Sequence, residues 1–263
     1  MDTSVVVTGG ARGIGRAIAA QLAARGHRVV VSDVDGAAAA DTAKEVGAEE
    51  GLTHDVRNPA EHRAVVEAAL DHGPLVAWFN NAGVGDDGRL AELTEEQVRR
   101  LVDVNLLGVL WGMRAAIGAF GTGGGDIVNT ASLAGLGPVP GYGVYAATKA
   151  AVVSLTGSVD AETPRRVRVH AICPDVADTA MLTEGHTPGS LGSRVAHSGG
   201  RVLTAEEVAR QAVSLVGSRR VVLSLPAWRG GVTRLAGVAP SLTRHAMPLV
   251  EAQGRRALAR RSS

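Results

Sequence analysis

The sequence predicts an α/β fold in which a doubly wound parallel sheet lies between two layers of helices. Short apolar runs typical of buried strands alternate along the chain with longer segments whose apolar residues recur at helical spacing. The chain has 263 residues, and no Pro/Ser-rich or charged linker divides it. Because α/β folds of this length commonly form one unit, we expect a single three-layer (α/β/α) domain, with residues 1–225 as its core and 226–263 as a helical extension.

The first strand is expected at Ser4–Thr8, where a run of valines is followed at once by a glycine-rich turn. The turn, Gly9–Gly15, leads into a segment with apolar residues at helical spacing. Glycines let the chain turn tightly and approach a pyrophosphate, and the free N–H groups of the helix start favour its negative charge. The order of strand, turn and helix therefore predicts a dinucleotide site of the Rossmann type, with an ordinary glycine-rich turn as the alternative.

The other elements continue the alternation. Strands are expected at Arg28–Ser32, Leu52–His54, Leu75–Phe79 and Asp126–Thr130, and helices at Ala37–Val46, Pro59–Asp71 and from Thr94 to about Ala119. Thr94 is a suitable N-cap for the last helix, with glutamates in its first turn. In open α/β sheets the ligand lies at the carboxyl ends of the strands. We therefore expect the residues that follow four of the strands to converge there, namely Gly9, Asn81, Ser132 and Pro174.

Tyr145 and Lys149 stand four residues apart in a segment expected to be helical, so their side chains lie on one face. A phenol loses its proton at about pH 10 in water. A nearby cation and the positive ring of a bound cofactor would lower that pKa toward the working range. The pair predicts an acid/base device, joined by Ser132 at the end of an apolar run. Tyr142 does not fit this role, because Ala146 stands four residues after it.

Several motifs, taken in chain order, resemble the short-chain dehydrogenase/reductase family over most of the chain, from about Thr3 to about Val222. The glycine turn has the spacing Gly9-x-x-x-Gly13-x-Gly15, which differs from the G-x-G-x-x-G of most dinucleotide folds. The other segments that carry the resemblance are Asn80-Asn81-Ala82-Gly83, Asp103-Val104-Asn105, Ile127 to Ser132, Tyr145 with Lys149, and Cys173-Pro174 through Thr179.

The resemblance implies roles for individual residues. Tyr145 would be the general acid/base at the substrate oxygen, and Lys149 would lower the tyrosine pKa and bind the nicotinamide ribose. Ser132 would hold the substrate oxygen, and Asn105 would place a water that links Lys149 to solvent. A helix cap for Ser132 and a core amide for Asn105 are the structural alternatives. The cofactor-binding residues would be Tyr145, Lys149, Gly9, Arg12, Gly13, Ile14, Gly15, Asp33, Asp55, Val56, Asn81, Ala82, Gly83, Pro174, Ala177 and Thr179.

Asp33, at the end of the second strand, favours NAD over NADP as the cofactor. An acidic side chain there accepts hydrogen bonds from the adenosine ribose hydroxyls and repels a 2′-phosphate. Arg12 in the glycine turn is the opposing feature, since a cation there could hold the extra phosphate. A turn residue at the end of a strand is the structural alternative for Asp33.

The sequence says less about the substrate. Val84, Ala134, Val139, Gly141 and Tyr142 are candidates to line an apolar pocket, which would suit a hydrophobic secondary alcohol or ketone. A mobile loop over the cleft is expected at about residues 182–203, which are rich in glycine. Its histidines, His186 and His197, lack a cluster of further ligands, so no metal site is expected.

We therefore expect an NAD-dependent oxidoreductase that interconverts a secondary alcohol and a ketone. Two other functions remain open. One is an NADPH-dependent ketoacyl or carbonyl reductase, which Asp33 argues against. The other is a dinucleotide-binding regulator without turnover, which the set of Asn105, Ser132, Tyr145 and Lys149 argues against.

The sequence departs from the family pattern in two places. Asp175 follows Pro174 where the family usually has glycine; if that position needs a positive φ, Asp is among the less costly replacements. After Val221–Leu223 the chain lacks the usual Asp-Gly-Gly ending and continues into a mixed helical tail. Because that ending often builds a tetramer contact, we expect a homodimer through the long helices or a different homotetramer. The tail would pack on the domain, cover the cleft or lie on a membrane.

Charge and cysteine content restrict the partners and the compartment. The 27 Lys+Arg and 26 Asp+Glu give a net charge of +1, so nucleic acid is not an expected partner. The arginines that crowd the last residues around Leu258 are interpreted as a solvated tail, with an anionic membrane or an acidic partner as the alternative. The sequence has one cysteine and leaves no room for a signal peptide after Met1. Its most apolar stretch, Val104–Met113, is too short to span a bilayer. We therefore expect a soluble, cytoplasmic protein.

Overall fold

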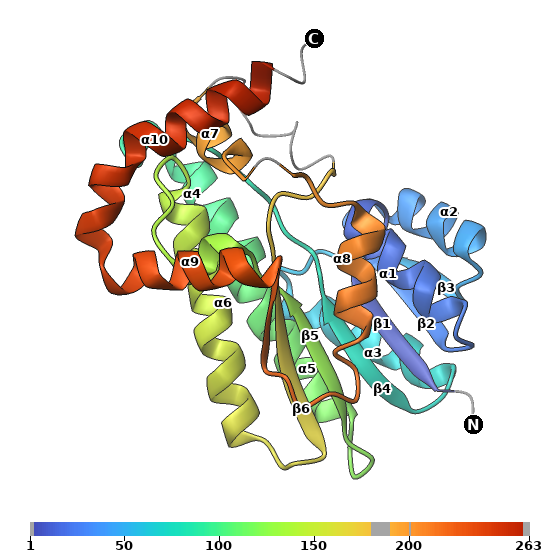
Figure 1. The fold of residues 1–263 in the computed structure, drawn as a ribbon. Helices are drawn as coiled ribbons and strands as arrows, with labels where there is room; N and C mark the ends of the chain where they lie inside the picture. Colours follow the sequence, from blue (N-terminus) through green and yellow to red (C-terminus); the bar gives the residue numbers. More distant parts are fainter. Residues whose placement is uncertain (1–2, 180–189, 200, 260–263) are drawn as a thin grey trace.

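The computed structural model describes residues 3–179, 190–199 and 201–259. They form one parallel sheet between two layers of helices (Figure 1), as the sequence predicts. Its strands run in the order β3-β2-β1-β4-β5-β6-β7, and every neighbouring pair is parallel. Their bounds are β1 (Ser4–Thr8), β2 (Arg28–Asp33), β3 (Glu50–Thr53), β4 (Leu75–Asn80), β5 (Gly125–Thr130), β6 (Val167–Pro174) and β7 (Val222–Leu225).

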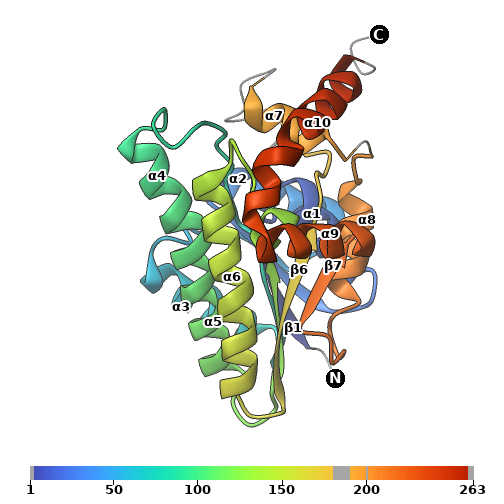
Figure 2. The same ribbon diagram turned by 60° about the vertical axis from the view of Figure 1, so that its left-hand side comes forward.

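Each face of the sheet is covered by its own helices, and two apolar cores result. One core joins the sheet to α1 (Gly13–Ala23), α2 (Gly36–Val46) and α8 (Ala205–Val213). The other joins it to α3 (Pro59–Asp71), α5 (Gly108–Ala119) and α6 (Gly143–Glu162), which stand together on one side of the sheet in Figure 2. The chain reverses its winding between β1 and β4, which is the point where open sheets of this kind bind ligands.

The third strand begins two residues and ends one residue earlier than the sequence predicts, at Glu50–Thr53 instead of Leu52–His54. It is the edge strand, and its register with β2 runs from Val30↔Glu50 to Asp33↔Thr53. None of its residues is buried. An edge strand without a buried apolar run leaves little periodicity from which its bounds could be predicted.

The helix expected from Thr94 to about Ala119 is continuous but not uniform. It consists of α4 (Glu95–Val102), a π-helical turn η1 (Asp103–Leu107) and α5. Thr94 forms a capping box with Gln97, which confirms the predicted N-cap. By length and composition alone, Glu95–Ala119 could cross a membrane, unlike the shorter stretch noted in the sequence. In the structure this helical segment packs against α3, α6 and β4. A helix in the core of a domain can have the same length and composition, so these two properties do not indicate a membrane span.

The segment expected as a mobile loop at about 182–203 contains a helix. Ser190 caps α7 (Leu191–His197) by accepting a hydrogen bond from the Ser193 N–H. Residues 180–189 and 200 lie outside the described part. The loop prediction is therefore wrong for Leu191–His197, because a serine cap and packing against α10 outweigh the high glycine content.

The C-terminal tail is helical, as predicted, and forms α9 (Ala227–Val238) and α10 (Pro240–Ala259). α9 contacts β7 and the 3-10 turn η2 (Leu133–Leu136), while α10 contacts α7 and α9. In Figures 1 and 2 these helices lie at the end of the sheet opposite the N-terminus, where the parallel strands have their carboxyl ends. The tail therefore joins the wall of the ligand cleft.

Candidate active site

A cavity of about 740 Å³ opens at the carboxyl ends of the strands. Its walls come from the glycine turn, the ends of β2, β4, β5 and β6, and the helices α7, α9 and α10. Nearly all of the predicted catalytic and cofactor residues line it. The exceptions are Gly15 and Asn105, which lie behind the wall.

The glycine turn is shaped by close approach of main-chain atoms. Gly9 has a φ of 60°, and a Cβ there would lie 2.6 Å from the Cα of Ala82. A Cβ on Gly15 would lie 2.1 Å from the Gly9 carbonyl oxygen. The helix α1 that follows begins at Gly13, which lines the cavity, and the N-cap residue Arg12 makes no side-chain cap hydrogen bond to its first N–H groups. This is the backbone arrangement that accommodates a pyrophosphate.

Asp33 lies at the end of β2 in the cavity wall, as predicted. One carboxylate oxygen accepts from the Ala11 N–H (3.1 Å) and the other from the Asp35 N–H (3.2 Å). These bonds hold the carboxylate beside the glycine turn with acceptor capacity remaining. Arg12 lines the same part of the cavity.

Asp55 and Val56 also line the cavity, where the resemblance places the adenine. Asp55 is held by Arg57, whose Nε and Nη2 donate to the carboxylate at 2.9 Å and 2.6 Å. This hydrogen bonding lowers the pKa of Asp55. The Val56 carbonyl accepts from His62 Nε2 at 2.9 Å, so a buried histidine fixes the backbone behind this wall.

The segment Asn81-Ala82-Gly83 is tied to the glycine turn through Thr8. The Thr8 hydroxyl accepts from the N–H groups of Asn81 (3.1 Å) and Ala82 (3.2 Å), and Asn81 Nδ2 donates to the Gly9 carbonyl (3.0 Å). These bonds explain why a threonine precedes the glycine turn and why Asn81 follows β4. They fix one wall of the cavity relative to another.

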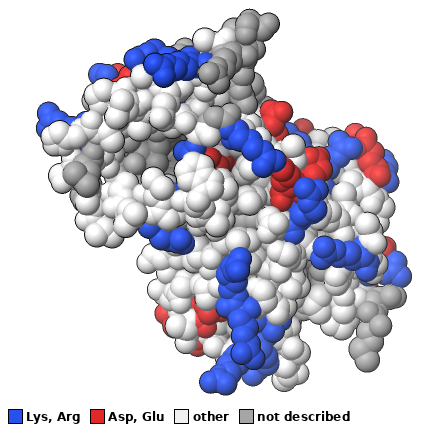
Figure 3. Space-filling view, in the orientation of Figure 1, with Lys and Arg blue, Asp and Glu red and all other residues white. Residues whose placement is uncertain are grey.

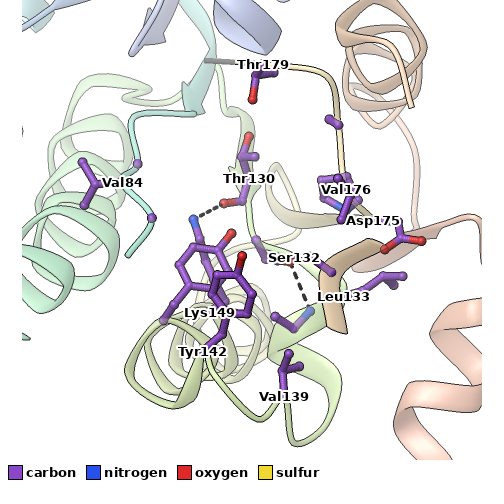
Figure 4. Close-up of a pocket in the computed structure, with 18 of the residues that line it drawn as sticks. Val84, Thr130, Ser132, Leu133, Val139, Tyr142, Lys149, Asp175, Val176 and Thr179 are labelled. Atoms are coloured by element: carbon purple, nitrogen blue, oxygen red, sulfur yellow. Dashed lines mark hydrogen bonds between the residues drawn. The ribbon is translucent and has the colours of Figure 1, made fainter. Parts of the chain in front are cut away.

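Ser132, Tyr145 and Lys149 all line the cavity, and Figure 4 shows Ser132 and Lys149 there. Lys149 Nζ donates to the Thr130 carbonyl at 2.9 Å and lies 5.7 Å from the centre of the Tyr145 ring. The Ser132 side chain hydrogen-bonds Tyr145. Thr130 was not among the sequence-predicted residues, because a main-chain acceptor leaves no side-chain signal.

Burial governs the titration of these groups. Burial raises the pKa of the Tyr145 phenol, and the hydrogen bond to Ser132 offsets part of this rise. The net direction is opposite to the lowering expected from Lys149, because desolvation is the larger effect. Burial also lowers the pKa of the Lys149 ammonium to about 8.

Asn105 lies in the π-helical turn η1 and is fully buried. Its Oδ1 accepts from the Val84 N–H and its Nδ2 donates to the Val84 carbonyl, both at 2.9 Å. A Cβ on Gly83 would lie 3.2 Å from Asn105 Oδ1 and 3.5 Å from Lys149 Nζ. Asn105 therefore stands behind Gly83, close to Lys149, in the kind of π-bulge that is frequent at functional sites.

The predicted substrate residues Val84, Ala134, Val139 and Tyr142 all line the cavity. Gly141 does not, and the prediction for it is wrong: it packs against Gly192 of α7 instead, and a Cβ there would lie 2.5 Å from the Gly192 nitrogen. Further apolar lining comes from α9 and α10, whose contribution cannot be assigned from sequence spacing alone. It consists of Val232, Ala236, Ala246, Met247 and Val250.

Asp175 has no strained backbone, since no non-glycine residue in the described part of the chain has a positive φ. Its carboxylate lies 3.1 Å from Nε of Arg229 in α9, and both side chains are largely buried. Burial raises the pKa of Asp175, and the Arg229 charge offsets part of this. Pro174, Ala177 and Thr179 line the cavity beside it. The negative charge of Asp175, which departs from the family pattern, is thus paired with Arg229 from the atypical C-terminal tail.

Within the described ranges, no group of three or more His, Cys, Asp or Glu side chains is arranged to hold a metal ion. His197 Nδ1 is 2.8 Å from the Ser193 carbonyl oxygen within α7. His186 lies outside the described residues.

Comparison with known proteins is consistent with this geometry. The sequence model of the family described as short chain dehydrogenase matches residues 3–188. The chain therefore belongs to the short-chain dehydrogenase family.

Two curated relatives and one solved structure show the range of similarity. The probable oxidoreductase EphD of Mycobacterium tuberculosis is 37% identical over 200 residues, which are 72% of this chain but only 34% of that longer protein. The sorbitol dehydrogenase of Cereibacter sphaeroides is 40% identical over 180 residues, 66% of this chain and 70% of its own. A crystal structure of a short chain dehydrogenase/reductase from Burkholderia phymatum in complex with NAD has a TM-score of 0.81 at 31% identity, covering 92% of this chain and 95% of its own.

Proposed function

We propose that this protein interconverts a secondary alcohol and a ketone by hydride transfer, with NAD as the redox cofactor. The observation that carries the proposal is that Ser132, Tyr145 and Lys149 line the same cavity as the glycine turn. A proton-transfer group and a dinucleotide cradle in one cavity are what this reaction requires.

The residues of the chain divide the acid/base work. Ser132 and Tyr145 present two hydroxyl groups to the oxygen of the substrate, so that Tyr145 gives a proton to a carbonyl or removes one from an alcohol. Lys149 is placed to bind ribose hydroxyls and to favour the phenolate by its charge. Asn105, buried behind Gly83 and close to Lys149, is proposed to order a water between Lys149 and solvent. NAD, when bound, supplies nicotinamide C4 as the hydride acceptor or donor.

The residues around the glycine turn fit this cofactor. The main chain at Gly9, Gly13 and Gly15 is close-packed and leaves the N–H groups of α1 for a pyrophosphate. The Asp33 carboxylate lies where it can accept from ribose hydroxyls and would repel a 2′-phosphate. The Burkholderia phymatum structure that shares this fold contains NAD. These points favour NAD over NADP.

The substrate is proposed to be apolar apart from its reacting oxygen. The cavity that contains Tyr145 is lined in part by aliphatic groups from three parts of the chain, including Val84, Val139 and Met247. Such a wall contributes binding energy in proportion to the apolar area it covers. The Asp175–Arg229 pair at its margin is neutralised internally and does not call for a charged substrate.

Replacing Tyr145 by Phe tests the proposal, and Tyr142 provides a matched control. The two rings are 5.9 Å apart, yet only Tyr145 has a lysine four residues on. With a panel of alicyclic and aliphatic secondary alcohols and NAD, Tyr145→Phe should lower kcat by a factor of about 100 or more, while NADH binding by titration stays within about threefold. Tyr142→Phe should retain turnover.

Three results would contradict the proposal. Equal turnover by the Tyr145→Phe variant and the parent would remove Tyr145 from the mechanism. Turnover with NADPH alone would indicate a carbonyl reductase of the other cofactor class. Tight NADH binding with no turnover of any alcohol or ketone in the panel would support a dinucleotide-binding regulator instead.

A further inference from the structure

The C-terminal helices expose apolar side chains to an unusual degree. Eight large hydrophobic side chains are exposed in the described part of the chain, and five of them lie between residues 228 and 249. They are Trp228, Val232, Leu235, Val238 and Leu249, with exposed fractions between 58% and 84%. Scattered single residues of this kind need no explanation, but a concentration on two adjacent helices does.

The apolar residues of α9 occupy the face that the domain leaves free. Trp228, Val232 and Leu235 follow the i, i+4, i+7 spacing of one helix face. The opposite face carries Gly230 and Gly237, and a Cβ at either position would meet Ser224 or Leu136 at 3.0 Å or less. Small residues thus seat α9 tightly on the domain. The large apolar side chains of α9 point away from the domain. Packing against the domain alone would favour the opposite arrangement, with large apolar side chains facing inward.

The outward side of α10 adds positive charge to this surface. Arg244, Arg255 and Arg256 are exposed, while Met247 and Val250 face the cavity. From Pro226 to Ala259 the sequence has five arginines and one acidic residue, Glu251. In Figure 3 the surface over α9 and α10 is mainly uncharged, with blue atoms at its margins. Exposed apolar side chains flanked by cations are the signature of a helix that lies in a membrane interface.

We propose that the outward faces of α9 and α10 dock this protein on an anionic membrane surface. Phosphate headgroups match the arginines, and Trp228, Leu235 and Leu249 enter the boundary between headgroups and acyl chains. A second copy of the chain fits the surface less well, because a two-fold contact would bring the same arginine-rich helices together with a single glutamate per copy to offset them.

The position of the surface connects docking to the cavity. Val232 is 58% exposed and also lines the cavity, and Ala236 lies one turn further along the same wall. Docking would therefore place one wall of the cavity next to the acyl chains. This consequence extends the proposed apolar substrate, but the docking itself does not depend on any reaction.

The test uses the full chain and vesicles of phosphatidylcholine alone or mixed equally with phosphatidylglycerol. Co-sedimentation should show binding to the mixed vesicles, with a blue shift of Trp228 emission, and at least about tenfold weaker binding to phosphatidylcholine. Leu235→Ser should weaken binding about tenfold or more. Leu90→Ser is the control and should not weaken binding, because Leu90 is distant in sequence but has a similar exposed fraction (73%, against 71% for Leu235). All of these substitutions are at exposed positions, and thermal unfolding checks that the fold is kept.

The charge contribution is tested by the double substitution Arg244→Gln and Arg256→Gln. It should reduce binding to the mixed vesicles more than Arg219→Gln with Arg220→Gln, two exposed arginines between α8 and β7. Equal binding to both vesicle types, or identical binding by the Leu235→Ser and Leu90→Ser variants, would overturn the proposal. So would Leu235→Ser leaving vesicle binding intact while dissociating an oligomer in sedimentation velocity, which would assign the surface to a second copy. Because none of these measurements involves NAD or turnover, their failure is distinct from failure of the proposed reaction.

Discussion

Lowering the pH should destabilise the fold through two buried histidines at the predicted adenine wall. His54 and His62 are each about 1% exposed, and their rings meet edge to face with centroids 4.4 Å apart. His54 Nδ1 lies 3.0 Å from the Ser32 hydroxyl, and His62 Nε2 lies 2.9 Å from the Val56 carbonyl. The remaining nitrogen of each ring has no hydrogen-bond partner among the described residues. Protonating either ring would thus place a charge where nothing solvates it.

The magnitude follows from the pKa of His54. Burial, with a smaller effect of His62, lowers this pKa from 6.5 to about 3. Because the folded-state pKa lies below the unfolded one, the contribution to stability is complete above pH 6.5 and is lost as the pH falls toward about 3. Between pH 8 and pH 5 the loss from His54 alone is about 2 kcal/mol. Burial also lowers the pKa of His62, which adds to the loss in the same pH range.

Urea unfolding at pH 8 and pH 5 measures this effect. His54→Asn keeps a nitrogen near the Ser32 hydroxyl but cannot titrate, so this variant should be less stable at pH 8 and should lose about 2 kcal/mol less than the parent between the two pH values. His27→Asn is a control at a less buried histidine. Equal pH dependence in the parent and the His54→Asn variant would show that folding does not lower the pKa of His54 and would refute the reasoning.

Two further predictions concern packing. In α5, Gly112→Ala should destabilise the fold by about 1–3 kcal/mol, because the new Cβ would lie 2.0 Å from Oδ1 of the buried Asn80. Gly118→Ala in the same helix should instead stabilise the fold by about 0.5–1 kcal/mol, because its new Cβ would meet no neighbouring atom within 4 Å. Thermal unfolding of the two variants checks this, and a Gly112→Ala variant as stable as Gly118→Ala would contradict it. Arg229→Gln should cost about 1–3 kcal/mol in urea unfolding, since Asp175 would lose its cation inside the structure; no change would show that the pair is dispensable.

The strands, the glycine turn and the catalytic helix could be predicted because each has a local signal. Ser4–Thr8 is a run of buried residues followed by a turn that only glycine can form, since a Cβ at Gly9 or Gly15 would strike main-chain atoms. Tyr145 and Lys149 share a helix face by spacing alone. These are short-range constraints, so they can be read directly from the order of residues.

What could not be predicted depends on contacts between distant segments. Asp175 and Arg229 are 54 positions apart, and nothing near either residue indicates the other. Thr130 acts through its main-chain carbonyl group, which leaves no side-chain signal in the sequence. The π-helical turn at Asp103–Leu107 has no residue composition that distinguishes it from an α-helix. Desolvation of the Tyr145 phenol, which raises its pKa, has no local signal in the sequence, whereas the Lys149 charge four residues away can be seen there.

Isothermal titration of the protein with NADH and then with NADPH tests the central claim most directly, because it needs no knowledge of the substrate. If the Asp33 carboxylate accepts hydrogen bonds from the ribose hydroxyls beside the glycine turn, NADH should bind at least about tenfold more tightly than NADPH. Tighter binding of NADPH would mean that Arg12 decides the preference, and binding of neither would contradict the assignment of the cavity to a dinucleotide.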